Sequence, residues 1–246
     1  MIISHKHRFI FVHVPKTAGT VVSVYLSRFL GPFDIILGAR GAAAAHGIKP
    51  NARTVFYAAT THSPIKVAET LIKGRFPDSL IGSGLRRKFA GKVWDHASAA
   101  EIERFAPKAW NNYYKFCFIR DPFKRAVSIY NWYYRKHASR PTFSEMLRMM
   151  EEGDPDAPKM IWQSWSLYAK DDEIAVDFVG RQETLSQDLK TVCDRIGVPF
   201  IESLLTQENV SQSSDFRLFY QPGDRERVQR LFAEEIDRFG YRYPAD

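Results

Sequence analysis

The sequence predicts an α/β protein in which helices cover both faces of a central, mostly parallel β-sheet. Two observations carry this prediction. Short, nearly continuous apolar runs recur along the chain, which is typical of strands buried on both faces, and helical patterns with recognisable caps lie between them. The 246 residues contain no Pro/Gly/Ser-rich linker and no internal repeat, so we expect a single domain spanning residues 1–246.

The beginning of the chain supplies the first strand and the first helix. Residues 9–14 are an apolar run that predicts a buried strand, and residues 15–19 interrupt it. Apolar residues then fall at helical spacing over residues 20–30. The prediction places no strand in the polar residues 1–8, and it treats residues 31–53, which are rich in Gly and Ala, mostly as loop.

The next part of the chain is predicted to hold a strand, a helix and a basic loop. A second buried strand is expected at residues 55–59. Pro64 suits the first turn of a helix that would extend to about residue 73. Residues 74–92 are irregular in pattern and basic, and Arg86 and Arg87 lie among them.

Cap signals organise the second half of the chain. Ser98 and Glu101 form a capping-box pattern, and Asp121-Pro122 supplies an N-cap followed by a first-turn proline. Strands that alternate with helices favour a parallel sheet. The elements predicted here are a helix at 99–105, a strand at 114–119, helices at 122–136 and 142–151, a strand at 175–179, a helix at 183–196, a polar loop at 208–221 and a final helix at 224–239 closed by Gly240.

Charge and cysteine content narrow the class of partner. Lys and Arg total 35 and Asp and Glu total 28, and the net charge of +7 suits phosphates, acidic glycans, a membrane surface or nucleic acid. Cys117 and Cys193 both lie in apolar-periodic stretches, so we expect them in the core. The sequence has no cluster of metal-binding type and no apolar run of the ~20 residues that a membrane span requires.

A first candidate phosphate site lies in Val-Pro-Lys-Thr-Ala-Gly-Thr, residues 14–20, between the first strand and the first helix. A helix N-terminus offers unpaired backbone N–H groups and the positive end of the helix dipole. Gly19 allows close approach of a ligand, Thr17 and Thr20 add hydroxyl groups, and Lys16 adds a charge. Lys16 precedes the glycine, so this is not the nucleotide loop G-x-x-x-x-G-K-[ST]. Alone, it is also compatible with an ordinary turn.

A second candidate site begins where the strand at 114–119 ends. Arg120 follows that strand, and Ser128 lies two helical turns later. A guanidinium group binds a phosphate through two hydrogen bonds, and a hydroxyl completes the site. A surface Arg and an ordinary helical Ser are the alternative.

Together, Val-Pro-Lys-Thr-Ala-Gly-Thr and Arg-Asp-Pro-Phe-x-Arg-x-x-Ser resemble the sulfotransferases that use 3′-phosphoadenosine 5′-phosphosulfate (PAPS). Within that family the chain is similar to the carbohydrate branch, which contains the heparan sulfate 2-O and chondroitin enzymes, and to bacterial relatives. Asp95-His96-Ala97-Ser98-Ala99, residues 179–183 and the ending Phe239-Gly240-Tyr241 carry the same resemblance. It implies a P-loop-like, three-layer α/β/α fold over one sulfotransferase domain. The lack of an apolar run long enough for a membrane span suits a cytoplasmic location, unless an anchor has been removed, and the transfer chemistry requires no metal.

The resemblance also implies roles for residues. The first loop would hold the 5′-phosphosulfate, and Arg120 with Ser128 would hold the 3′-phosphate. Arg181 would lie near the nucleotide, with a structural ion pair as the alternative, and Gln182 departs from the Phe or Tyr of many relatives. The nucleotide-binding residues implied are Pro15, Lys16, Thr17, Ala18, Gly19, Thr20, Arg120, Ser128 and Arg181.

Sulfuryl transfer needs charge stabilisation at the leaving oxygen and a base for the attacking hydroxyl. Lys16 is placed for the first role. The resemblance implies His96 for the second, with His62 as the runner-up on the substrate side and a structural histidine as the alternative. His13, within the first strand, is expected to be structural.

The acceptor is expected to be a carbohydrate or glycoconjugate. Arg86 and Arg87 are candidate contacts for an acidic glycan, although the pattern slightly favours a solvated loop. Trp132, Tyr133 and Tyr134 suit either stacking on a sugar or core packing, and Lys124, Arg125, Arg135 and Lys136 are expected on a solvated helix face. Two rivals remain, a P-loop-type nucleotide kinase and a non-catalytic basic module that binds glycan. The prediction includes no nucleic-acid partner, and it leaves the acceptor's identity and the oligomeric state open.

Overall fold

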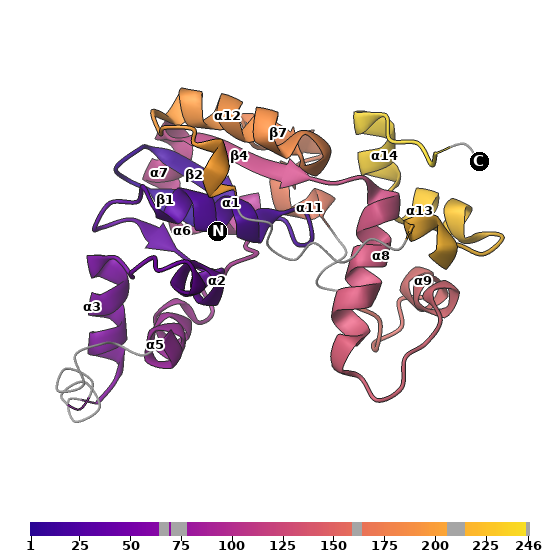
Figure 1. Ribbon diagram of the computed structural model, residues 1–246, viewed down its shortest axis with the longest axis horizontal. Coiled ribbons are helices and arrows are strands. Elements are labelled where there is room, and N and C mark those ends of the chain that lie inside the picture. The colour runs from indigo at the N-terminus through magenta and orange to yellow at the C-terminus, as the bar shows by residue number, and fades with distance from the viewer. Residues whose placement is uncertain (64–68, 70–77, 159–163, 206–214, 245–246) are drawn as a thin grey trace.

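A five-stranded sheet forms the centre of the protein (Figure 1). The computed structural model describes residues 1–63, 69, 78–158, 164–205 and 215–244. The strand order is β3-β1-β2-β4-β7; β2, β4 and β7 run parallel, and β1 is antiparallel to both of its neighbours. The predicted α/β fold with a mostly parallel, P-loop-like sheet is confirmed. The strands are β1 (Ile2–Ser4), β2 (Phe9–Val12), β3 (Ile35–Ile36), β4 (Tyr114–Ile119) and β7 (Phe178–Arg181).

Helices connect and cover the strands. A short hairpin, β5 (Ala169–Lys170) and β6 (Glu173–Ile174), precedes β7. Among the residues described, no helix is long and apolar enough to cross a membrane. The α-helices are α1 (Gly19–Ser27), α2 (Arg40–Ala45), α3 (Ala52–Thr61), α5 (Asp78–Phe89), α6 (Ala99–Phe105), α7 (Pro107–Asn112), α8 (Pro122–Tyr133), α9 (Phe143–Glu151), α11 (Trp165–Tyr168), α12 (Leu185–Ile196), α13 (Asp224–Leu231) and α14 (Ala233–Phe239), and the 3₁₀ helices are η1 (Tyr134–Lys136), η2 (Gln182–Thr184), η3 (Glu202–Leu204) and η4 (Phe216–Phe219).

Alternating side chains of the central strands enter two different cores, as the two-residue period of a strand requires. On one face, Val12 and Cys117 pack with apolar residues of α6 and α7. On the other, Phe11 and Phe116 pack with residues of α1 and α12, among them Cys193. Both cysteines are buried, as predicted.

A third apolar cluster joins α8 to α9 and α13. Figure 1 shows these helices together at the right of the view, whereas α3 and α5 form a pair at the lower left. Strand β4 ends at Ile119 and helix α8 begins at Pro122, so the residues between them lie at the N-terminus of this helix. Because β2, β4 and β7 are parallel, the segments that follow them begin at the same edge of the sheet.

Two of the predicted local structures between residues 55 and 92 are wrong. The strand expected at residues 55–59 lies inside helix α3, where the Asn51 side chain caps the helix by accepting a hydrogen bond from the Thr54 N–H group. The basic stretch expected to be irregular holds α5, whose last turn carries Arg86, Arg87 and Lys88 next to the negative end of the helix dipole. The predicted helix from Pro64 lies outside the described residues, apart from Glu69.

Other differences arise where short apolar stretches gave a weak signal. Residues 2–4 form the fully buried strand β1, and residues 31–53 contain β3 and α2 rather than loop alone. The strand predicted at 175–179 is β7, which begins three residues later at Phe178. The final helix is divided at Phe232, and Gly240 ends it in a left-handed conformation as predicted.

Candidate active site

The loop between β2 and α1 has a backbone shaped for anions. Lys16 and Ala18 both have φ of 66°, whereas Thr17 between them does not have a positive φ. Such alternation turns successive N–H groups toward one point, and left-handed conformations outside glycine cost about 1–3 kcal/mol each. The buried Thr17 hydroxyl donates to the carbonyl oxygen of Val14 at 2.9 Å and fixes the loop from inside.

Gly19 is required by a neighbouring side chain rather than by its own backbone. A Cβ atom added there would lie 2.0 Å from Cδ2 of His13 and 2.2 Å from its Nε2. His13 is buried, as expected for a structural residue, and its ring stacks on Phe11. The first turn of α1 therefore rests directly on the imidazole that precedes the loop, and Thr20 lies half-buried in the same turn.

Two cations from different motifs meet at this edge of the sheet. The pKa of Lys16 is lowered to about 8 by burial and by the positive charges of Arg120 and Arg135. Its Nζ atom lies 5.7 Å from the centre of the Trp132 ring. Burial also lowers the pKa of Arg120, which Glu183 partly opposes. The charge of Arg120 disfavours the charged form of Lys16, and burial disfavours the charged form of both residues, so an anion placed between them would stabilise both cations.

Arg120 is positioned by the start of α8. The Asp121 carboxylate caps the helix by accepting from the N–H groups of Phe123 and Lys124. The Asp121 N–H group itself donates to Glu183 at 2.8 Å. Ser128 is half-buried on α8, two turns beyond Arg120. The end of β4 and the first turns of α8 thus hold the second motif in a fixed geometry.

Arg125 contacts the candidate site in a way that sequence analysis missed. It was expected on a solvated helix face, but it is fully buried. Its Nε donates to the carbonyl oxygen of Pro15 at 3.1 Å, and its Nη1 donates to Ser164 at 2.7 Å. Ser164 and Tyr168 both donate to the buried Glu235. One signal was available, because Arg125 lies three residues before Ser128 and so shares its helix face.

His96 lies beside the same loop. Its Nδ1 is 2.9 Å from the carbonyl oxygen of His13, and its Nε2 is 3.6 Å from Oδ2 of Asp95. A carbonyl oxygen only accepts hydrogen bonds, so Nδ1 carries the proton and Nε2 can accept one. Burial lowers the pKa of His96, the charges of the Met1 amino group and Arg125 lower it further, and Asp95 opposes them. The ring is therefore neutral near pH 7.

Residues 1–242 match the sequence model of the sulfotransferase family. The chain belongs to the sulfotransferase family. It is also similar to an uncharacterized protein of Archaeoglobus fulgidus, with 26% identity over 114 residues that span 46% of this chain and 91% of that protein. The family match covers both candidate motifs, so the two cations at the sheet edge belong to a transferase that moves a sulfuryl group.

The other residues predicted for this sulfotransferase site lie on β7 and on the α3–α5 pair. Arg181 ends β7, beside the last residue of β4; its guanidinium donates to the carbonyl oxygen of Phe239 at 3.0 Å and stacks on Tyr241. His62 lies at the C-terminal end of α3, and its side chain contacts residues of α5. Its Nε2 faces the Leu80 carbonyl oxygen at 2.9 Å, and its Nδ1 faces Arg87 at 3.4 Å.

Arg86 stacks on Trp94, its ring centre 5.9 Å away. The structure thus brings Lys16, Arg120 and the loop together, with His96 beside the loop, and places His62, Arg86 and Arg87 on the α3–α5 pair.

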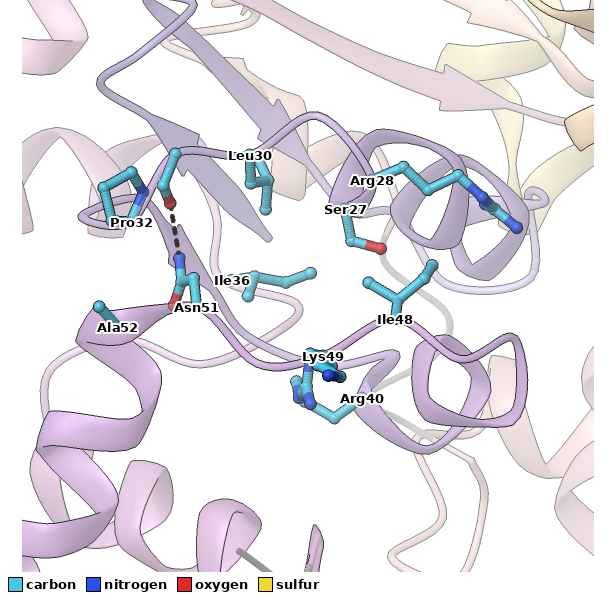
Figure 2. A pocket seen from close by; sticks show the side chains of 11 residues that line it. Ser27, Arg28, Leu30, Pro32, Ile36, Arg40, Ile48, Lys49, Asn51 and Ala52 are labelled. Carbon is cyan, nitrogen blue, oxygen red and sulfur yellow. Dashed lines mark hydrogen bonds between the residues drawn. The ribbon is translucent and has the colours of Figure 1, made fainter. Parts of the chain in front are cut away.

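A separate cleft of about 370 Å³ lies at the C-terminal end of α1. Figure 2 shows Arg40 and Lys49 close together on its wall, and Asn51 donating to Gly31, while the Arg28 side chain extends away. Its described lining includes none of the sequence-predicted site residues. The cleft is therefore distinct from the candidate active site of the sulfotransferase.

Proposed function

We propose that this sulfotransferase transfers the sulfuryl group of PAPS to a hydroxyl group of a carbohydrate or glycoconjugate. The observation that carries the proposal is that the positive charge of Arg120 lowers the pKa of Lys16, although the two residues come from separate motifs at one sheet edge. A donor with phosphate at both its 5′ and 3′ positions has anionic groups for both. The proposal treats residues 1–246 as one domain, since the family match runs through residue 242.

In this proposal the donor lies across the two motifs. The loop from Pro15 to Thr20 binds the 5′-phosphosulfate through the backbone N–H groups that follow Pro15 and through the Lys16 ammonium group. Arg120 and the Ser128 hydroxyl bind the 3′-phosphate. Arg125 does not contact the donor; it holds the loop through the Pro15 carbonyl oxygen. The loop and the helix that carry the two halves of the donor site are thereby fixed to each other.

The chemistry follows from positioning and charge. His96 Nε2 takes the proton of the acceptor hydroxyl as the acceptor oxygen attacks sulfur. The bond between sulfur and the bridging phosphate oxygen breaks, and Lys16 stabilises the negative charge that develops on that oxygen. The imidazolium formed at His96 is stabilised by Asp95, 3.6 Å from Nε2. Lys16, Arg120 and the loop N–H groups meet the donor's charges, so the proposal requires no metal.

A thermal-shift comparison tests the proposal. The ligands are PAPS, its desulfated product 3′-phosphoadenosine 5′-phosphate (PAP), ATP and heparin. PAP and PAPS are expected to raise the melting temperature, and ATP is not, because it lacks a 3′-phosphate. Transfer of radiolabelled sulfate from PAPS to an added glycan completes the test. Stabilisation by ATP with Mg²⁺ alone would support a kinase, and salt-sensitive binding of heparin without PAP binding would support a glycan-binding module.

A further inference from the structure

One face of α8 extends from the buried Arg125, which contacts the loop between β2 and α1, to the protein surface. Arg125, Ser128, Trp132 and Arg135 follow one another at helical spacing, with Arg135 in the 3₁₀ turn η1 that extends α8. Arg125, at the buried end, holds the carbonyl oxygen of Pro15. Trp132 lies one turn beyond Ser128, and Arg135 lies almost one turn beyond Trp132. The face therefore continues past the residues assigned to the donor.

Trp132 is unusually exposed for its position. Its side chain is 42% exposed, whereas Tyr130 and Tyr134 on either side of it are 8% and 6% exposed and belong to the α8–α9–α13 core. An exposed indole next to a candidate catalytic lysine contributes little to packing. Its exposed ring face is available for stacking on a ligand next to that lysine.

Two cations contact the indole. The guanidinium group of Arg135 lies 4.4 Å from the ring centre, and Nζ of Lys16 lies 5.7 Å from it. Arg135 also donates a hydrogen bond to the carbonyl oxygen of Trp132. The ion pairs within the described part of the chain give Arg135 no carboxylate partner. The guanidinium is thus held in a defined orientation beside the indole, with its charge unmatched by any described carboxylate.

The position of Lys16 shows which end of the donor Trp132 faces. In the proposed site Lys16 marks the sulfuryl-transfer end, and Arg120 with Ser128 marks the 3′-phosphate. Trp132 contacts Lys16 and lies beyond Ser128 on the exposed side. A group at this position meets the acceptor rather than the adenosine.

We propose that Trp132 and Arg135 form a platform that binds an acidic sugar acceptor. The indole receives the C–H face of the sugar ring, and the guanidinium of Arg135 binds the carboxylate or sulfate ester of that sugar or its neighbour. A planar guanidinium group binds such oxyanions through paired hydrogen bonds. Because the Arg135 guanidinium is already held in one orientation, binding the oxyanion costs less conformational entropy. This inference rests on the proposed sulfotransferase function and specifies its acceptor class.

The experiment uses a heparosan hexasaccharide, which contains glucuronic acid, and its carboxyl-reduced counterpart, which is neutral. Four proteins carry the test: wild type, Trp132→Ala, Trp132→Phe and Arg135→Gln. The controls are Phe33→Ala, an aromatic residue that is 65% exposed elsewhere, and Arg195→Gln, a guanidinium stacked on Tyr114 at 5.5 Å. Calorimetry gives the Kd of PAP, and radiolabelled transfer gives kcat and KM for each sugar.

Trp132→Ala is expected to raise the KM for both sugars by about tenfold or more while the Kd of PAP changes less than threefold, and Trp132→Phe is expected to recover most of the loss. Arg135→Gln is expected to raise the KM for heparosan by about tenfold and to leave the neutral sugar nearly unchanged. The control variants are expected to match wild type.

Two outcomes would overturn the platform. One is an equal loss of PAP affinity in Trp132→Ala, which would assign the indole to the nucleotide. The other is failure of the wild type to bind or sulfate heparosan, which would exclude the acidic sugar. Failure of the proposed function is separate, because it would appear as absent PAP binding in the wild type.

Discussion

The ring of His96 and the backbone carbonyl of His13 are joined by a 2.9 Å contact between residues that are far apart in sequence. The contact places the proton of neutral His96 on Nδ1 and leaves the lone pair of Nε2 available. His13 immediately precedes the donor loop, so the same strand end sets both the loop and the tautomer of the proposed base.

His96→Gln is expected to remove transfer and to retain the nucleotide site. Loss of a general base lowers the rate by about 10²–10⁴-fold, whereas the donor contacts assigned to Lys16, Arg120 and Ser128 remain. Transfer of radiolabelled sulfate gives kcat, and calorimetry gives the Kd of PAP, which should change less than threefold.

The matched control is His62→Gln, because His62 lies between α3 and α5 and has no role in proton transfer in this proposal. It should retain wild-type kcat within a few fold. If His62→Gln loses transfer while His96→Gln keeps it, the assignment of the base is reversed.

The rate should depend on pH through two groups. Neutral His96 is the active form, and its pKa is lowered from its ordinary value of 6.5, so kcat/KM for PAPS should fall only as the pH decreases below 6.5. Charged Lys16 is the active form, and its pKa of about 8 predicts a second decrease above that pH. In the pH profile of kcat the alkaline decrease should occur at a higher pH, because bound phosphate stabilises the charged lysine and raises its pKa.

A pH profile measured with His96→Gln and Lys16→Arg provides the check. The histidine variant should lose the acid limb from its residual rate, and the arginine variant should lose the alkaline limb. An unchanged alkaline limb in Lys16→Arg would mean that another group controls it.

Arg120→Gln should reduce discrimination for the 3′-phosphate. A hydrogen bond to a charged group contributes about 1.5–3 kcal/mol, so the Kd of PAP should rise by about 10–100-fold, with little change in the Kd of AMP, which lacks the 3′-phosphate. Lys16→Gln should raise the Kd of both PAP and AMP, because both carry the 5′-phosphate. Calorimetry gives the ratio of the Kd of AMP to the Kd of PAP. If this ratio in Arg120→Gln equals that of the wild type, Arg120 does not bind the 3′-phosphate.

Gly19→Ala should disrupt the donor loop. The added Cβ would lie 2.0 Å from the His13 ring, so the loop or the ring must move. PAP binding should weaken, and the free energy of unfolding should fall. Gly82→Ala in α5 is the control, because its Cβ would meet nothing within 4 Å; replacing a helical glycine should stabilise the protein by up to about 1 kcal/mol. Urea unfolding and calorimetry measure both effects, and normal PAP affinity in Gly19→Ala would contradict this account of the loop.

The parts of the fold that were predicted correctly are those with local signals. The predicted capping box at Ser98 begins α6, and Asp121 begins α8 with the expected side-chain cap. The helix predicted at residues 142–151 is α9, which begins with a capping box at Thr142. The loop around Lys16 was predicted because a buried strand and a helix flank it. In each case the determining contacts lie within a few residues of one another.

The parts that were missed depend on contacts between distant segments. The apolar run at 55–59 suits a strand by composition, and the cap at Asn51 that makes it a helix was overlooked. The burial of Arg125 depends on Ser164, Tyr168 and Glu235, whose approach no periodicity reveals. The orientation of His96 depends on a backbone carbonyl, which carries no sequence signal.

The buried Arg125–Glu235 pair gives the last prediction. The two groups lie 3.9 Å apart, and both side chains are less than 5% exposed. Arg125→Met leaves the Glu235 carboxylate buried without its cation, which typically costs about 3–5 kcal/mol of unfolding free energy. It also removes the hydrogen bond to the Pro15 carbonyl oxygen, so PAP affinity should fall in the same variant.

A double-mutant cycle separates the two effects. Adding Glu235→Gln to Arg125→Met removes the unmatched charge, so urea unfolding should show that much of the lost stability returns. PAP affinity should remain low, because the Pro15 carbonyl oxygen still lacks its donor. Recovery of PAP affinity together with stability would mean that Arg125 supports the fold in general and has no specific effect on the donor loop.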